Sequence, residues 1–363
     1  MKKLTAHVFL ACAVMGMVAW RLANAQPAQI MNTAQVVNTP QVVNIYSARH
    51  YPGDEQLYAG FTKATGIKIN RVDSDDANIV QRLKAEGAAS PADVILLVDA
   101  ARLWSAEAAG LFAPVKSSVL DAAIPANLSA KARPEGTPWF GFSTRARIVV
   151  YDKARVKRED IDTYEKLAAP VNKGMVCTRS GSHPYNLSLF GAMMVHLGEK
   201  ATQDWLSGMV ANAARAPKGG DVDQIRAVAS GECGIAVTNS YYLARMMRSS
   251  VAADRDLAEK LGVVFPNQST WGTHINISGG GMARYVKNSA NAVKFLEYLA
   301  SNEAQNYFAN GNNEWPAANG VTVTNAALQT ISGGSAKFET IPISAVGMNL
   351  TKVQQMLDRA GYK

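Results

Sequence analysis

The run Gly234-Ile235-Ala236-Val237-Thr238-Asn239-Ser240-Tyr241-Tyr242-Leu243-Ala244-Arg245 indicates the fold class of this chain. Its first five residues form a short apolar segment that is typical of a strand, and the residues from Tyr241 onward favour a helix. Two phenol oxygens therefore stand at a strand-to-helix turn, where α/β folds gather ligand groups. Phenolate is a hard anionic oxygen donor, and such donors suit hard cations. The run thus predicts an α/β protein with a candidate metal ligand pair at Tyr241 and Tyr242.

Strand-like and helix-like segments alternate along the rest of the chain. The run at 93–98 is nearly continuously apolar, as in a strand covered on both faces. This alternation predicts an α/β protein with largely parallel sheets, and the length of the chain predicts two lobes. Strands are expected at 42–46, 93–98, 148–151, 175–177 and 234–238, and helices at 54–64, 163–168, 186–197, 201–213 and 222–230.

The first residues have the pattern of an export signal. Lys2 and Lys3 form a basic start, the apolar run 8–20 is too short for a comfortable membrane span, and Ala23-Asn24-Ala25 gives a cleavage pattern. We expect a signal peptide over 1–25, export to the periplasm, and a flexible mature N-terminus over 26–40. An N-terminal membrane anchor is the alternative.

Charge and cysteine content narrow the class of protein. The net charge of +8 falls to +5 without the signal, because its three bases leave 34 of 37 against 29 acids. Lys and Arg form no block, so the sequence gives little support for nucleic-acid binding. Cys177 and Cys233 lie outside the signal, and a disulfide between them and two buried thiols are both compatible with the sequence.

Six segments, spread over about 41–360 and in the same order, resemble the periplasmic ferric-ion-binding proteins of bacterial iron ABC importers. Together they are far more specific than any single motif. The matching segments are Tyr46-Ser47-Ala48-Arg49-His50-Tyr51, Ser90-Pro91-Ala92-Asp93-Val94, Trp139 to Arg147, Arg179-Ser180 through Tyr185-Asn186, Asn239 to Arg245, and Phe265-Pro266-Asn267-Gln268 leading to Gly272–Gly279.

The resemblance implies the class II periplasmic-binding-protein fold, in which two α/β lobes enclose a ligand cleft. The first lobe would comprise 41–143 and 270–320, and the second 144–269 and 321–363. The iron ligands implied for this sequence are His50, Tyr51, Tyr185, Tyr241 and Tyr242. This set is similar to that of the tyrosine-rich subgroup, and the Glu that other members use has no family-style match here.

Charge balance supports the implied site. Four phenolates and a neutral imidazole on Fe(III) carry one net negative charge, and a buried charge needs a partner. The resemblance implies this role first for Arg145, and Arg49 and Arg179 flank the proposed ligands. A carbonate ion is expected to bridge Arg145 and the iron if one ligand is missing. Of the remaining histidines, His183 is expected in solvent and His274 in the core.

The sequence therefore predicts a monomeric periplasmic receptor that binds Fe(III) and delivers it to an inner-membrane permease with a cytoplasmic ATPase. The chain has no nucleotide-binding motif, and no catalysis is expected. A small-anion-binding protein of the same fold is one alternative, and an iron enzyme with tyrosinate ligands is another. Whether Fe(III) or Fe(II) binds first is open at this stage.

Overall fold

The computed structural model describes residues 41–49, 51 and 53–363. The expected signal peptide, the segment 26–40 and His50 therefore lie outside the described residues. The chain from Pro40 to Lys363 forms one compact unit. Among its described helices, none combines the length and the apolar character that a membrane crossing requires.

The first lobe is built on a sheet in which β1 (Val42–Ser47) lies between β2 (Lys68–Asp73) and β3 (Val94–Val98), all parallel. The strand β9 (Ile275–Ala283) follows β3 in the antiparallel sense, with Leu96 opposite Gly280. The other elements of this lobe are α1 (Asp54–Thr65), α2 (Asp76–Glu86), α3 (Ala100–Ala108), β4 (Phe112–Ala113), α4 (Ser118–Ala123), α10 (Ser289–Leu299) and α11 (Asn302–Asn312).

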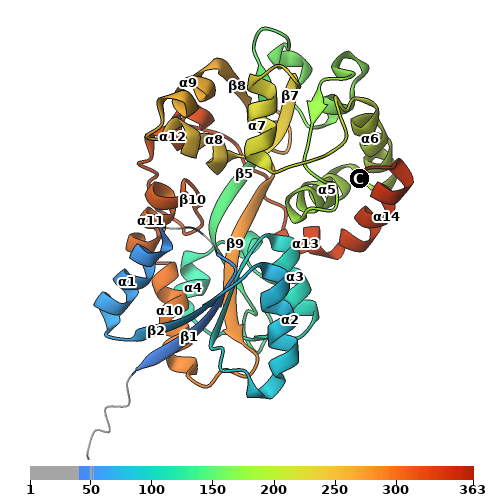
Figure 1. The fold of residues 1–363 in the computed structure, drawn as a ribbon. Helices are drawn as coiled ribbons and strands as arrows, with labels where there is room; N and C mark the ends of the chain where they lie inside the picture. Colours follow the sequence, from blue (N-terminus) through green and yellow to red (C-terminus); the bar gives the residue numbers. More distant parts are fainter. Residues whose placement is uncertain (1–40, 50, 52) are drawn as a thin grey trace, which may run out of the picture. The chain divides into compact units, whose positions relative to one another are not determined.

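The long strand β5 (Phe140–Asp152) joins the two lobes (Figure 1, green). Its residues 140–146 pair with β9, and its residues 147–152 pair with β7 (Ile235–Asn239) and β8 (Leu261–Val264). The order β2-β1-β3-β9-β5-β7-β6 is thus one hydrogen-bonded path. β10 (Trp315–Pro316) also pairs with β5.

The expectation of largely parallel sheets is wrong. Between named strands of the described chain, parallel pairing is confined to β1 with β2 and β3, and to β6 (Val176–Cys177) with β7. The remaining pairs between named strands of the described chain involve β5 or β9, and all are antiparallel. These two strands run between the lobes in opposite directions, a crossing that local alternation of strand and helix does not reveal.

The second lobe surrounds the β5 half that follows residue 146. Successive β5 residues point to opposite faces of the sheet, so Ile148 and Val150 pack into one apolar cluster while Val149 packs into another. Its elements also include α5 (Pro184–Leu197), α6 (Glu199–Ala211), α7 (Asp221–Ala229), α8 (Ser240–Met247), α9 (Ala252–Lys260), α12 (Ala326–Ser332) and α14 (Leu350–Ala360). The helix α13 (Ile343–Met348) packs on both α3 and α5, and its Ile343 and Val346 belong to the apolar core around β1 and β3.

Short 3-10 helices complete the described elements at Gly87–Ala89, Ala126–Leu128, Arg158–Asp160, Glu165–Ala168 and Pro170–Asn172. The expected α-helix at 163–168 is one of these. It ends at Ala168 because Ala169 precedes Pro170 and adopts an extended backbone, with ψ of 144°. The lobe limits drawn from the sequence stay a prediction, because each core cluster draws on residues from several separate stretches of the chain.

Cys177 and Cys233 form a disulfide, with their Cα atoms 5.9 Å apart. Cys177 ends β6, and Cys233 lies two residues before β7, so the bond joins the two neighbouring parallel strands near the start of β7. It closes a loop of 56 residues that contains Tyr185. The question that the sequence left open is thereby answered in favour of the disulfide.

Candidate metal centre

Tyrosines stand at three turns where a strand leads into a helix. Tyr51 lies between β1 and α1, and Tyr241 is the second residue of α8, directly after β7. Tyr185 is the second residue of α5, which begins at Pro184, a residue suited to the first helical position because it has no N–H to leave unpaired. These turns place the side chains at the carboxyl ends of strands, where α/β sheets bind ligands.

The structure brings the four predicted tyrosines together. The hydroxyls of Tyr185 and Tyr241 are 3.3 Å apart, although the residues are 56 positions apart in the chain. The ring of Tyr51 meets that of Tyr241 edge to face at 6.1 Å between centroids. The Tyr242 ring lies against that of Tyr241 at 4.1 Å. One first-lobe phenol and three second-lobe phenols thus form a single cluster, which we call the tyrosine cluster.

The tyrosine cluster is largely removed from water. Tyr51, Tyr185 and Tyr241 are 7%, 8% and 1% exposed, and Tyr242 is partly buried. Burial raises the pKa of Tyr51 and of Tyr241 well above 10, and neighbouring negative charge, from Glu314 or from the other phenols, raises them further. Burial also raises the pKa of Tyr185, against the pull of Arg145. Without a cation the phenols of Tyr51, Tyr185 and Tyr241 therefore hold their protons.

Glu314 is an acidic residue of the site that the sequence did not reveal. Its carboxylate is fully buried, and it accepts hydrogen bonds from the Tyr51 hydroxyl at 3.0 Å and the Ser143 hydroxyl at 2.7 Å. No local signal marks it, because it lies in the short connection between α11 and β10, 263 residues from Tyr51. Only the path of the chain through the first lobe places it beside the cluster.

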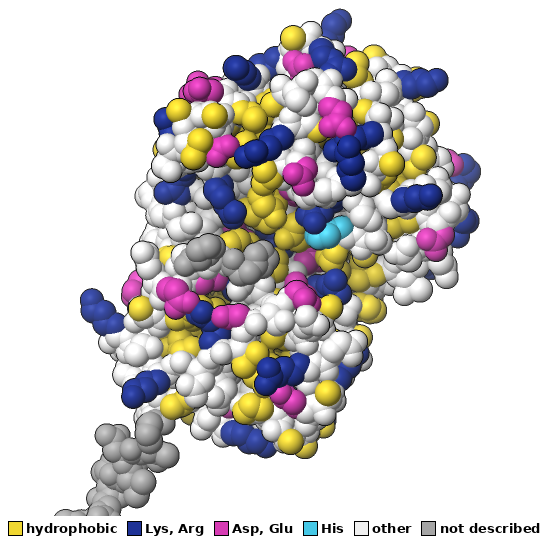
Figure 2. Space-filling model, viewed as in Figure 1, with side chains coloured by type: hydrophobic (Ala, Val, Ile, Leu, Met, Phe, Trp, Pro, Cys, Tyr) yellow, Lys and Arg dark blue, Asp and Glu magenta, His cyan; other side chains and the backbone are white. Residues whose placement is uncertain are grey.

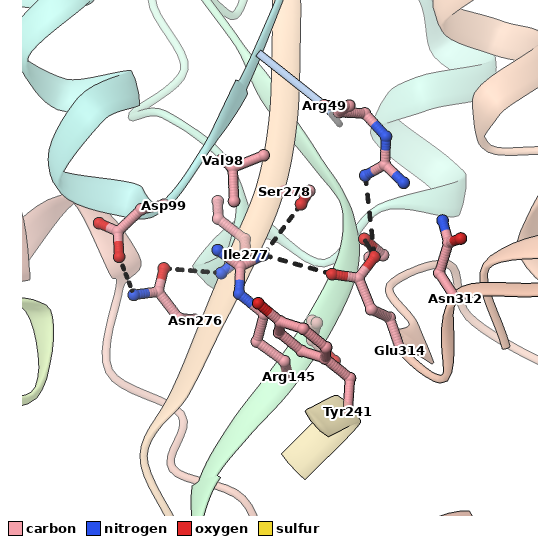
Figure 3. Close-up of polar contacts among 12 residues, drawn as sticks. Arg49, Val98, Asp99, Arg145, Tyr241, Asn276, Ile277, Ser278, Asn312 and Glu314 are labelled. Carbon is pink, nitrogen blue, oxygen red and sulfur yellow. Dashed lines mark hydrogen bonds and ion pairs between the residues drawn. The ribbon is translucent and has the colours of Figure 1, made fainter. Parts of the chain in front are cut away.

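Arg145 and Arg49, both predicted from the sequence, contact this carboxylate (Figure 3). Arg145 Nη1 is 3.6 Å and Arg49 Nη1 is 3.7 Å from its oxygens. Arg145 also donates to Ser278 at 2.9 Å, and its guanidinium carbon lies 5.7 Å from the centre of the Tyr185 ring. Its Nε and Nη2 are buried without a hydrogen-bond partner among the described residues. Such unpaired donors beside phenols suit a site that gains negative charge when it fills.

The third predicted arginine, Arg179, lies on the second-lobe side. Its guanidinium carbon is 5.0 Å from the centre of the Tyr185 ring, and its Nη1 is 3.3 Å from Asp221 Oδ1. Arg147 lies 6.0 Å from the same ring centre, although the sequence gave it no role. Three guanidinium groups therefore face Tyr185, which places positive charge where a phenolate would form.

The two other histidines for which the sequence gave an expectation, His183 and His274, differ in outcome. The expectation that His183 lies in solvent is wrong: it is partly buried, its Nδ1 accepts from the Tyr185 N–H at 3.2 Å, and its ring meets that of Tyr185 at 4.6 Å. Burial, with Arg179 and Arg147, lowers its pKa to about 3, so the imidazole is neutral. His274 is fully buried as expected and bonds to Glu339 through Nδ1.

The described part of the molecule carries a hollow on one face (Figure 2) and a cavity lined in part by Tyr51. Figure 2 shows a hollow over the middle of this face, lined by yellow side chains, a class that includes tyrosine, with dark-blue Lys and Arg side chains near its edge. A cavity of about 420 Å³ opens beside Tyr51 and Arg49. Across 41–49, 51 and 53–363, His, Cys, Asp and Glu side chains form no group of three or more that could hold a metal ion.

A tyrosine cluster drawn from both lobes of an α/β fold is in keeping with a two-lobed binding protein. The family of bacterial extracellular solute-binding proteins matches residues 56–330. Iron uptake protein A1 of Synechocystis sp. is 44% identical over 319 residues, which cover 88% of this chain and 87% of that relative.

Two solved structures are also similar to this chain. The FutA protein of Trichodesmium in complex with iron and citrate is 45% identical, with a TM-score of 0.83 over 89% of this chain and 100% of that one. The ferric binding protein of Campylobacter jejuni is 36% identical, with a TM-score of 0.81 over 88% of this chain and 100% of that one. The chain belongs to the bacterial extracellular solute-binding protein family.

Proposed function

We propose that this protein binds Fe(III) in the periplasm through the phenolate oxygens of Tyr51, Tyr185, Tyr241 and Tyr242, with His50 as a further ligand. The observation that carries the proposal is the 3.3 Å separation of the Tyr185 and Tyr241 hydroxyls, with the other two rings packed against Tyr241. One related structure is named as a complex with iron and citrate, and another is named a ferric binding protein. Both names support iron as the ligand proposed for this chain.

The chemistry of the donors favours a trivalent hard cation. Four anionic oxygens stabilise Fe(III) more than softer divalent ions. Each phenol must lose its proton to bind, and a cation at the cluster lowers the phenol pKa enough for this to happen. Arg145, with two unpaired N–H groups, and Arg179 then face the new negative charge.

Arg145 already shares its charge with Glu314, so a carbonate at this place would compete with an internal carboxylate for the same guanidinium. We therefore infer that the iron needs carbonate only when one protein ligand is lost. The bound iron passes to an inner-membrane permease driven by a cytoplasmic ATPase, and the receptor itself acts as a monomer without catalysis.

Elemental analysis and a visible spectrum of protein purified from the periplasm test the proposal, before and after citrate stripping at low pH. We expect about one iron per chain and a phenolate-to-iron absorption band that disappears on stripping and returns with ferric citrate. Loading with ferrous iron under nitrogen, followed by air, shows which oxidation state binds first. Colourless, iron-free protein that a small anion stabilises against heat would favour the anion-binding alternative, and steady turnover of a substrate would favour an enzyme.

A further inference from the structure

A buried ion pair between Arg147 on β5 and Asp221, the first residue of α7, lies behind the tyrosine cluster. Each residue is 1% exposed, and Arg147 Nη1 is 2.5 Å from Asp221 Oδ2. Buried ion pairs add little net stability, because removing both charges from water offsets their attraction. Net stability therefore does not explain the further hydrogen bonds that Arg147 and Asp221 make.

Arg147 and Asp221 both form hydrogen bonds with residues that lie one or two positions from proposed ligands in the sequence. Arg147 Nη2 donates to Asn186 Oδ1 at 2.7 Å, and Asn186 directly follows Tyr185. Asp221 Oδ2 accepts the Asn239 N–H at 2.7 Å, and Arg147 Nη1 is 3.2 Å from Asn239 Oδ1. Asn239 is the residue before α8, two positions ahead of Tyr241. One ion pair thus ties together the starts of α5 and α8.

The second oxygen of Asp221 extends the network to the loop before α5. Asp221 Oδ1 is 3.3 Å from Arg179 Nη1. Asn186 Nδ2 donates to the carbonyl oxygens of Arg179 and Ser180, at 3.0 Å each. The loop, the helix start and the guanidinium that faces Tyr185 are therefore held by connected hydrogen bonds, and a network of this kind limits how far any one member moves.

We propose that Arg147 and Asp221 are positioning residues, which hold the starts of α5 and α8 at the spacing that lets Tyr185 and Tyr241 bind the same ion. The inference rests on the proposed function, and neither residue touches the cargo. Groups that orient metal ligands through hydrogen bonds commonly change metal affinity by about 10–100-fold when they are removed.

The planar fork of arginine is essential to this role. Two nitrogens of Arg147 reach Asp221, Asn239 and Asn186 at once, whereas the single ammonium of a lysine cannot match that geometry. If the pair served stability alone, Arg147→Lys would leave iron binding unchanged as long as the protein folds. If the pair sets the ligand spacing, the same substitution would weaken iron binding in the folded protein.

The test compares Arg147→Lys and Asp221→Asn with the wild-type protein and with Asp93→Asn as a matched control. Asp93 is fully buried and hydrogen-bonded like Asp221, but it lies at the amino end of β3, whereas the tyrosines stand at the carboxyl ends of strands. Three quantities are measured for each protein: iron affinity by citrate competition, the wavelength of the phenolate-to-iron band, and the separation of the Tyr185 and Tyr241 hydroxyls in iron-free crystals. Urea denaturation establishes the conditions under which each variant is folded.

Under those conditions we expect iron affinity to fall about 10–100-fold in both site variants, with a shifted band and a hydroxyl separation different from 3.3 Å. Asp93→Asn should match the wild type in all three. The positioning role would be overturned if folded Arg147→Lys kept the wild-type iron affinity, absorption band and separation of the Tyr185 and Tyr241 hydroxyls. If the wild type binds no iron, the proposed function is wrong, and the separation in iron-free crystals then decides the positioning role alone.

Discussion

The hydroxyl of Tyr51 donates a hydrogen bond to Glu314 Oε1 at 3.0 Å, while the other oxygen of that carboxylate accepts from Ser143 at 2.7 Å. Arg49 and Arg145 flank the same carboxylate at 3.7 and 3.6 Å. Glu314 thus orients the only described first-lobe tyrosine of the cluster and balances part of the positive charge beside it. Both roles require an ionised carboxylate with two acceptor oxygens.

Glu314→Gln should therefore destabilise the protein and make iron binding depend on an added anion. An amide has one acceptor oxygen, so either Tyr51 or Ser143 loses its partner, and two buried arginines lose a counter-charge. Removing one member of such a buried pair costs about 3–5 kcal/mol of unfolding free energy, which urea denaturation of the iron-free protein measures. Iron affinity should rise when bicarbonate is added to the variant and change little in the wild type.

The exposed carboxylate of Glu135 offers a control for that experiment, because Glu135→Gln removes the same charge from the surface. Its unfolding free energy and its response to bicarbonate should equal those of the wild type. A Glu314→Gln protein as stable as the wild type, with no response to bicarbonate, would show that the arginines do not need this carboxylate.

Replacing Tyr241 and Tyr242 together by Phe should weaken and shift the phenolate-to-iron absorption band, which Tyr51 and Tyr185 alone would then supply, and weaken iron binding by more than about 10–100-fold, the loss typical of groups behind the ligands. The rings and their packing remain, so the change removes only the oxygen donors. The visible spectrum and citrate competition measure the two effects. Tyr285→Phe, at a site 46% exposed, should leave both unchanged. A double variant whose absorption band and iron affinity both equal those of the wild type would contradict the ligand assignment.

Iron uptake should release protons, and affinity should therefore fall as the pH is lowered. Burial raises the pKa values of Tyr51, Tyr185 and Tyr241, so these phenols are protonated before the ion arrives. Binding as phenolates then releases up to about four protons per ion from the cluster. Calorimetry with ferric citrate in buffers of different ionisation enthalpy counts them. Release near zero at pH 7 would mean that the phenols are not the donors.

Local pattern predicted much of the fold. The expected strand at 42–46 and helix at 54–64 agree with β1 and α1 to within one residue, and the strand at 93–98 agrees with β3. What the sequence did not reveal is the start of β5 at Phe140, eight residues before the expected strand. Polar residues such as Ser143, Thr144 and Arg145 mask it, because their hydrogen-bond partners lie on distant parts of the chain.

The candidate site likewise contains residues that the sequence could predict and residues that it could not. The pair Tyr241 and Tyr242 could be predicted from local sequence because it stands at a strand-to-helix turn, whereas Tyr51 and Tyr185 were implied by the resemblance to ferric-ion-binding proteins. Glu314, Arg147 and Asp221 could not, because their roles arise from contacts across 18 to 263 positions of sequence. The role of His50 stays a prediction, because that residue lies outside the described residues.

Replacing Cys177 and Cys233 together by Ala should lower the unfolding free energy and leave the iron site intact. The bond closes a 56-residue loop, for which the loss of chain entropy in the unfolded state corresponds to roughly 4 kcal/mol. Urea denaturation of the double variant measures the loss. Under folding conditions its absorption band should match that of the wild type, since β6 and β7 still pair. Loss of the band in folded protein would instead assign the disulfide a part in shaping the site.

Asp76→Asn should stabilise the protein at neutral pH and not at acid pH. Burial raises the pKa of this carboxyl from 3.8 to about 6, while the Val98 N–H, which donates at 2.9 Å, and Arg102 act in the opposite direction. Below pH 3.8 both the folded and the unfolded chain hold the proton. As the pH rises from 3.8 to 6, the unfolded chain loses this proton while the folded chain still holds it, so stability is lost across this window, and the loss stays constant above pH 6.

An amide cannot ionise and still accepts from Val98, so we expect the variant to gain up to about 3 kcal/mol over the wild type at pH 7.5 and nothing at pH 4. Urea denaturation at the two pH values measures both differences. The neighbouring exposed Asp75, whose side chain accepts from the Asn78 N–H at the start of α2, is the control, because Asn serves that position equally well. An Asp76→Asn protein less stable than the wild type at pH 7.5 would show that Arg102 stabilises the carboxylate more than burial disfavours it.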